Sequence, residues 1–149
     1  MAAEIVYVDE PYLSVGRHIE FQCLHSQWKG FSTSAEFRAG AARLLAVIQE
    51  TSATALISDT RELELVASED QLWIRDSWLP LAAAAGLKRV ALLVAHQGLG
   101  KFAIDEMRSQ VRSQIQRHVQ TAPAGLLSRE FDSLDEARIW ADSSGPVNE

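Results

Sequence analysis

The chain has 149 residues, of which 47% are hydrophobic and 23% are charged, and it contains a single cysteine. This length and composition are typical of one globular domain with its own core, and they exclude a disordered chain and a disulfide-stabilised scaffold. The 20 acidic and 14 basic residues give a net charge of −6, which argues against binding to nucleic acid through phosphate contacts. No apolar run is long enough to span a membrane and no signal peptide is recognisable, so we expect a cytoplasmic protein.

The first residues predict a hairpin-like start. Residues 5–9 have the composition of a strand, Glu10 and Pro11 interrupt it, and a weaker strand pattern runs from about Tyr12 to Leu24. Within that second segment, polar residues alternate with apolar ones, and this period of two places Cys23 on the buried side.

The middle of the chain predicts a strand–helix–strand unit, preceded by a helix from about 34 to 50. That first helix is opened by the capping box Thr33-x-x-Glu36. An apolar run at 55–57 indicates a buried strand, a second capping box at Ser68-x-x-Gln71 opens a helix over 69–85, and residues 89–95 form another strand. Pro80 lies inside the helical pattern, so we expect a kink near Asp76.

The last third predicts two more helices. The helix over 99–119 carries only a narrow apolar stripe, which includes Met107, Val111 and Ile115. Such a stripe indicates a helix that lies on the edge of the sheet or against a second copy of the chain, and we predict a homodimer. A short strand follows at 129–132, and Ser133 caps a final helix over 133–142. We therefore expect one domain over residues 1–142 and a flexible tail over 143–149.

The strongest candidate site consists of polar residues that follow the two central strands. Asp59, Thr60 and Arg61 come directly after one strand, and His96 and Gln97 come directly after the next. Open α/β sheets bind ligands beyond the carboxyl ends of their strands, so these side chains are expected to line a crevice. The alternative is structural: Asp59 caps a loop, and Arg61 pairs with Asp59 or Glu62.

The four tryptophans divide into two pairs. Trp78 and Trp140 fall on apolar helical faces and are expected in the core. Trp28 is expected in a loop and Trp73 lies off the main stripe of its helix, so these two are candidates for a pocket or a contact surface, with the core as an equal alternative.

Three other motifs carry little chemical information. The stretch from Gly98 to Ala103 matches G-x-G-x-x-A, but no acidic residue follows at the spacing of a dinucleotide site, and a turn explains it as well. Cys23 and His25 are too few ligands for a metal centre, and Cys23 is better interpreted as a buried, unreactive thiol. No nucleophile elbow is present. We expect no metal, no cofactor and no catalysis.

Several segments together resemble one family. They are the early hairpin, the W-K-G-F-S-T-S-x-E-F run from Trp28 to Phe37, the Asp59-Thr60-Arg61 triplet, the helix with Trp73, and S-L-D-E-A-R-I-W from Ser133 to Trp140. This set resembles the STAS/SpoIIAA-like proteins, also described as STAS/SEC14-like, and in particular their small stand-alone bacterial members. The resemblance implies an α/β fold, the SpoIIAA-like β/α superhelix, with a mixed central sheet of about four to five strands and about four helices.

The resemblance also implies a function in binding. Proteins of this fold act as anti-sigma-factor antagonists and transporter tails that bind protein partners, and related folds hold a lipid or a nucleotide. The antagonists carry a phosphorylated serine in a D-S-S-G-like segment between a strand and a helix, where this chain has only Thr60. The literal D-S-S-G at 142–145 follows the last helix and does not match that position.

Two hypotheses follow for the function. The first is a non-enzymatic interaction or regulatory module that binds a protein partner or a second copy of itself as a homodimer. The second is a binder of a small anionic ligand or lipid that uses the crevice at the strand ends.

Overall fold

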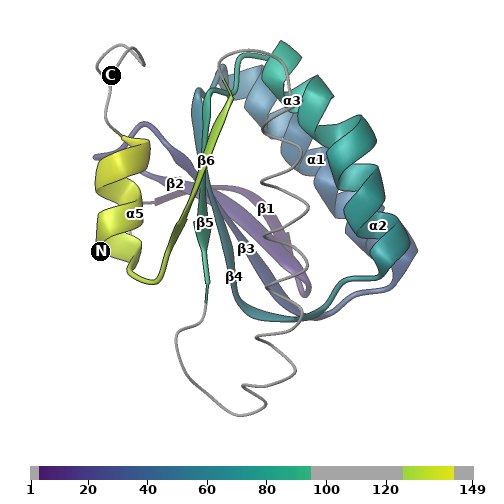
Figure 1. Cartoon of the computed structure of the whole chain (residues 1–149). Coiled ribbons are helices and arrows are strands. Elements are labelled where there is room, and N and C mark those ends of the chain that lie inside the picture. Colours follow the sequence, from purple (N-terminus) through teal and green to yellow (C-terminus); the bar gives the residue numbers. More distant parts are fainter. Residues whose placement is uncertain (1–3, 95–125, 143–149) are drawn as a thin grey trace.

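The computed structural model describes residues 4–94 and 126–142, and these residues form an α/β fold around one six-stranded sheet (Figure 1). The strands lie side by side in chain order, and their bounds are β1 Glu4–Glu10, β2 Leu13–His18, β3 Leu24–Phe31, β4 Ala55–Leu65, β5 Arg89–Leu93 and β6 Leu127–Phe131. β1, β2 and β3 pair antiparallel, whereas β3, β4, β5 and β6 pair parallel. The expected mixed sheet is confirmed.

The sheet has six strands where four to five were expected. The difference arises between Tyr12 and Leu24, where the chain forms β2, a turn, and the start of β3 rather than one long strand. The turn is closed by the amide of Phe21, which donates to the carbonyl of His18 at 2.9 Å, and Ile19 is 59% exposed on it. The local alternation resembled a strand, but Cys23 is buried as predicted.

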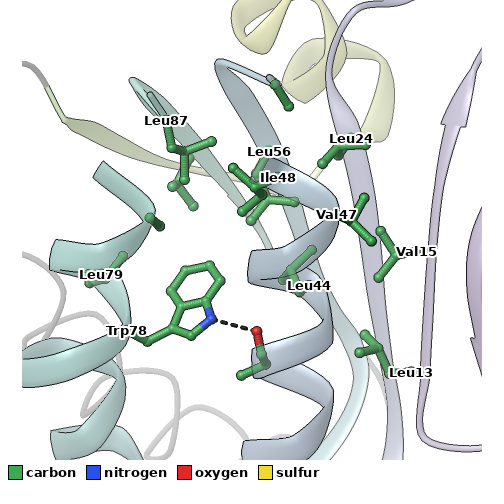
Figure 2. Close-up of a cluster of buried hydrophobic side chains, with 14 of the residues drawn as sticks. Leu13, Val15, Leu24, Leu44, Val47, Ile48, Leu56, Trp78, Leu79 and Leu87 are labelled. Atoms are coloured by element: carbon green, nitrogen blue, oxygen red, sulfur yellow. Dashed lines mark hydrogen bonds between the residues drawn. The ribbon is translucent and has the colours of Figure 1, made fainter. Parts of the chain in front are cut away.

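One face of the sheet carries two long helical segments and most of the core. α1 (Ser34–Thr51) connects β3 to β4, and a second segment, built from α2 (Ser68–Trp73), η1 (Ile74–Trp78) and α3 (Leu79–Ala84), connects β4 to β5. Both lie on the same face (Figure 1). Their apolar side chains pack on the side chains that the strands direct toward them (Figure 2). This core includes Leu13, Val15, Leu24 and Leu56 from the strands and Leu44, Ile48, Trp78 and Leu79 from the helical segments.

The ends of the first helix follow from local chemistry. Thr33 caps α1 through its side chain, which accepts from the amide of Glu36, and the Glu36 carboxylate accepts from the amide of Thr33, so the predicted capping box is confirmed. The helix ends at Ser52, which has a positive φ of 56°. The second predicted box is wrong: Ala67 precedes α2, and no side chain caps that helix.

Pro80 does not break the second helical segment. Proline has no amide hydrogen to bond to the carbonyl four residues earlier, and the chain responds with the π-helical turn η1. There the amide of Leu79 donates to the carbonyl of Ile74, five residues earlier. The turn directs Trp78 toward α1, and its Nε1 donates to the carbonyl of Ala41 at 2.6 Å (Figure 2).

The opposite face of the sheet carries a smaller cover. α5 (Leu134–Ala141) follows β6 and packs over β4, β5 and β6 on an apolar cluster formed by Cys23, Ala55, Ile57, Ala91, Leu93, Ala137 and Ala141. Its cap is confirmed, because the Ser133 side chain accepts from the amide of Glu136. No helix in the described ranges is both long and apolar enough to cross a membrane.

Several sequence-based expectations fall on residues outside the described ranges. They are the helix over 99–119 with its Met107, Val111 and Ile115 stripe, the glycine-rich stretch at 98–103, the candidates His96 and Gln97, and the tail over 143–149. Of the four predicted helices, the other three are present.

Candidate functional site

The Asp59-Thr60-Arg61 triplet lies inside a strand rather than at its end. β4 pairs with β5 as far as Asp59, opposite Leu93, and then continues alongside β3 to Leu65. The prediction that the strand stops on this triplet is therefore wrong. The signal was present in the sequence, because Glu62, Leu63, Glu64 and Leu65 alternate with the period of a strand.

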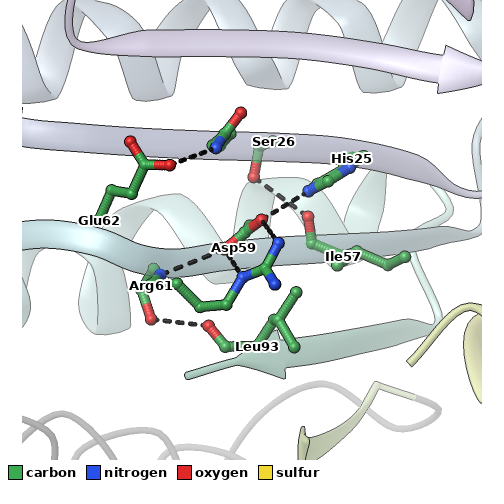
Figure 3. Close-up of polar contacts among 9 residues, drawn as sticks. His25, Ser26, Ile57, Asp59, Arg61, Glu62 and Leu93 are labelled. Atoms are coloured by element: carbon green, nitrogen blue, oxygen red, sulfur yellow. Dashed lines mark hydrogen bonds and ion pairs between the residues drawn. The ribbon is translucent and has the colours of Figure 1, made fainter. Parts of the chain in front are cut away.

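A β-bulge sits at the triplet. Asp59 pairs with Gln27 and Glu62 pairs with Lys29, so two residues of β4, Thr60 and Arg61, lie opposite the single residue Trp28 of β3. Bulges bend a strand and redirect its side chains. The Thr60 hydroxyl donates to the carbonyl of Leu93 at 2.9 Å and so closes the end of the β4–β5 ladder (Figure 3). Thr60 therefore has a structural hydrogen bond within the sheet.

Asp59 is the centre of a polar cluster on the sheet face that carries α5. Its Oδ1 accepts from the amide and from Nε of Arg61 at 3.1 and 3.0 Å, and its Oδ2 accepts from Nη2 of Arg61 at 2.9 Å. Oδ2 also lies 2.9 Å from Nε2 of His25 on β3 (Figure 3). These four contacts use the hydrogen-bonding capacity of one carboxylate.

The cluster holds a charge that is almost removed from water. Asp59 is 1% exposed, whereas the Arg61 side chain is 40% exposed. Burial by itself raises the pKa of the Asp59 carboxyl, but the hydrogen bonds from His25 and Arg61 outweigh it and hold this pKa well below its usual range. The hydrogen bond to Asp59 likewise raises the pKa of Arg61. Asp59 is therefore ionised, and Nε2 of His25 must carry the hydrogen that points at it.

The burial of Asp59 changes what Arg61 does for the fold. The structural alternative, an ion pair with Asp59, is correct, but the pair is not the exposed one that the sequence suggested. Removing the guanidinium leaves a buried carboxylate with His25 as its remaining side-chain donor, and an uncompensated buried charge is costly. We therefore expect replacement of Arg61 to lower the stability of the fold.

Polar groups surround the cluster on the neighbouring strands. Nε2 of Gln27 donates to the Glu62 carboxylate at 3.1 Å (Figure 3). Gly16 lies opposite His25, and a Cβ at Gly16 would meet a carboxylate oxygen of Glu4 at 3.1 Å, so this carboxylate lies above the glycine on the same face. The polar surface thus begins where the apolar patch under α5 ends.

His25 is the site residue that sequence reasoning missed. The sequence suggested only a metal ligand or a base beside the Cys23 thiol, and the described ranges hold no group of three or more side chains that could ligate a metal ion. Cys23 is buried, and burial together with the charge of Asp142 raises the pKa of its thiol to about 11, which agrees with an unreactive cysteine. Only the register between β3 and β4 brings His25 to Asp59.

The two candidate tryptophans do not join the cluster. The loop placement of Trp28 is wrong: it lies in β3, is 6% exposed, and packs its ring on Phe37 with centroids 4.8 Å apart. Trp73 packs against the same core, with the Arg38 guanidinium 5.0 Å from its ring centroid. Both belong to the face opposite Asp59. His96 and Gln97 lie outside the described residues.

The topology separates the cluster from the crevice expected at strand ends. Such a crevice forms where the strand order reverses, but β3, β4 and β5 follow one another in order with both crossover helices on one face. The cluster lies on the other face.

No family model matches the chain, and neither a curated protein nor a solved structure is similar enough to count as a match.

Proposed function

We propose that the chain is a non-enzymatic interaction module of the SpoIIAA-like kind and that it binds a protein partner through the sheet face around Arg61. One observation carries this proposal: the guanidinium of an arginine whose side chain is 40% exposed is held by two hydrogen bonds to a buried carboxylate on the same strand, which also accepts from the amide of that arginine. An arginine held in this way binds at a small entropic cost, and arginine is enriched among the residues that dominate protein interfaces.

The arrangement of elements supports the SpoIIAA-like part of the proposal. An antiparallel start is followed by parallel strands with crossover helices, and the chain closes with a short strand and a helix that returns to the sheet. Two of the segments on which the resemblance rests form regular elements: the Trp28 run forms the end of β3 and the start of α1, and the closing run from Ser133 caps and forms α5.

The geometry favours binding over catalysis. All acceptor positions of Asp59 are engaged within the protein, so this carboxylate cannot also take a proton from a substrate without losing a structural contact. The exposed part of the cluster is then the outer edge of the Arg61 guanidinium with Gln27 and Glu62 beside it. This set can donate to and accept from a partner's backbone and side chains.

A small anionic ligand or a lipid is the weaker alternative. The charge of Arg61 is already balanced by Asp59, and Glu62 adds a further negative charge at the surface. A free anion therefore meets little net attraction here, whereas a protein surface can supply both charges. With either kind of partner, we propose that the protein acts in the bacterial cytoplasm. Formation of a homodimer through Met107, Val111 and Ile115 is a separate prediction.

The experiment compares Arg61→Gln with Arg43→Gln. Arg43 forms an exposed ion pair with Glu10, remote from the cluster, so its variant controls for the loss of one positive charge. Partner proteins retained by the immobilised wild type and by Arg43→Gln, but lost from Arg61→Gln at a temperature where all three are folded, support the proposal. Native mass spectrometry showing a co-purified lipid or nucleotide that Arg61→Gln releases would favour the alternative instead.

A further inference from the structure

A second buried carboxylate holds a second half-exposed arginine, on the face of the sheet opposite Asp59. Asp70, in the first turn of α2, is 2% exposed, and its Oδ1 accepts from Nε of Arg38 at 2.9 Å and from the hydroxyl of Ser34 at 2.7 Å. Arg38 and Ser34 belong to α1, which lies beside α2 on the same face (Figure 1). The Arg38 side chain is 42% exposed.

Arg38 is restrained along one edge and on one face of its guanidinium. The Nε edge is bonded to Asp70, and the guanidinium carbon lies 5.0 Å from the centroid of the Trp73 ring. Trp73 in turn packs against the main core. No hydrogen bond within the described part of the chain engages Nη1 or Nη2 of Arg38. These two nitrogens therefore form an open fork that the fold holds in place.

The charges beside Arg38 favour an anion more than those beside Arg61 do. Two side-chain nitrogens of Arg61 are bonded to Asp59, and Glu62 adds a second negative charge. Arg38 gives a single nitrogen to its carboxylate. The residues one turn away from it on α1 carry no charge, and they are Ser34, Ala35, Ala41 and Ala42. A carboxylate that approaches the Arg38 fork thus meets no second acid one turn away on α1.

From this geometry we infer that Arg38 and Trp73 form a second binding surface, which takes a carboxylate side chain of an acidic protein segment. The planar fork matches a carboxylate bidentately, and the stacking on Trp73 reduces the ordering that binding would otherwise require. A free carboxylate is a poorer occupant, because a single exposed ion pair contributes little by itself. A protein segment adds apolar contacts on α2, where Leu72, next to Trp73, is 39% exposed.

The test uses a blocked peptide in which glutamates alternate with leucines, and a matched peptide with glutamines in place of the glutamates. Each peptide is titrated into the full chain at constant ionic strength, and NMR follows the Nε–H signal of Arg38 and the indole N–H signal of Trp73. We expect the acidic peptide to shift both signals to saturation. The neutral peptide should bind at least about fivefold more weakly, which is the loss expected for an interface hot spot.

Two variants locate the binding. Arg38→Lys keeps a positive charge beside Asp70 but removes the fork, so the acidic peptide should bind at least about fivefold more weakly. Arg43→Lys makes the same change on the same helix, in an exposed pair with Glu10, and should bind as the wild type does. Thermal melts establish that both variants are folded at the temperature of the titration.

Equal affinity of the two lysine variants, equal affinity for the two peptides, or shifts that leave Arg38 and Trp73 unmoved would each overturn the inference. Arg38 would then serve only to join α1 to α2. The inference does not depend on the proposed function, because Arg61→Gln leaves this surface intact. Peptide binding that is lost in Arg61→Gln and kept in Arg38→Lys would overturn it as well and would place the acidic contact at the Arg61 face.

Discussion

The two faces of the sheet bury their side chains in different ways. The face under α1 and α3 is filled with interlocking apolar side chains, and its tight contacts include Gly40, where a Cβ would meet Leu13 and Trp28 at 3.0 and 3.1 Å. The face under α5 has a small apolar cluster and, beside it, a carboxylate that is 1% exposed. Apolar packing dominates the first face, where a buried carboxylate, Asp70, accepts from Ser34 and Arg38 between α1 and α2. On the second face the buried carboxylate and its compensating charges lie on the strands of the sheet itself.

This contrast separates stability from binding. A buried ion pair contributes little to stability compared with an apolar group of the same size, yet removing one partner is costly. Under the proposed function, the charged cluster around Asp59 serves recognition rather than folding. The contrast can be tested by disrupting each face in turn.

The largest loss of stability is expected on the apolar face. Trp78→Ala removes a ring that is 5% exposed and should lower the free energy of unfolding by about 3–5 kcal/mol. Trp78→Phe keeps most of the packing but removes the hydrogen bond to Ala41, and it should cost about 1–2 kcal/mol. Denaturant unfolding measures both. Equal losses in the two variants would show that the indole nitrogen, and not the packing, matters most at this position.

On the polar face, Arg61→Gln should lower the free energy of unfolding by about 2 kcal/mol. This is less than for a fully buried pair, because Arg61 is 40% exposed and His25 still donates to Asp59. Arg43→Gln, which breaks a pair whose side chains are 51% and 38% exposed, should cost less than about 1 kcal/mol. If the two variants lose the same stability in the same denaturant series, the burial of Asp59 has no energetic consequence.

The depressed pKa of Asp59 predicts how acid acts on this face. A carboxylate with a lowered pKa in the folded protein contributes stability that is complete above the unfolded pKa of about 3.9 and is lost as the pH falls below it. His25→Gln and the double variant His25→Gln/Asp59→Asn isolate this contribution from the histidine. Their difference in unfolding free energy should be constant above about pH 5 and should shrink below about pH 4, by about 1.4 kcal/mol per unit of pKa shift.

A difference between those two proteins that stays constant down to about pH 2 would contradict the depressed pKa. Urea unfolding at a series of pH values, at constant ionic strength, provides the measurement.

Within the Asp59–Arg61 region, the smallest effect is expected at the bulge. Thr60→Val keeps the shape of the side chain but removes the donor to the Leu93 carbonyl, and it should cost about 1 kcal/mol of unfolding free energy. Thr60→Ser keeps the donor and should lie closer to the wild type. Phosphorylation of Thr60 would require its hydroxyl to leave the Leu93 carbonyl. An unfolding free energy that does not change in Thr60→Val would show that breaking this hydrogen bond costs little.

Local patterns predicted the elements of the apolar face well. The helix from Thr33 was predicted from its capping box, and Phe37, Ala41, Leu44 and Ile48, which follow at helical spacing, are buried. Such contacts lie within a few residues of one another along the chain, so the sequence displays them directly. The strand count failed at 19–23 because a turn with alternating polar residues has the same local pattern as a strand.

The polar face could be predicted only in part. The sequence marked Asp59 and Arg61, which are two residues apart, and it offered their ion pair as an alternative. It gave no sign of the third member, because His25 lies 34 residues from Asp59 and its neighbour in the sequence, Cys23, suggested a different chemistry. The extension of β4 to Leu65 was visible as an alternation but was hidden by the expectation of a strand end.

The sequence by itself determined the α/β class, the helices of the described part of the chain, and the capping of α1 and α5, since these depend on periodicity and on short-range hydrogen bonds. The tertiary structure decided the register of β3 on β4, the bulge at Thr60 and Arg61, and thus the burial of Asp59 between His25 and Arg61. Register is set by how whole faces pack against helices, and a shift of one residue would turn His25 to the opposite face.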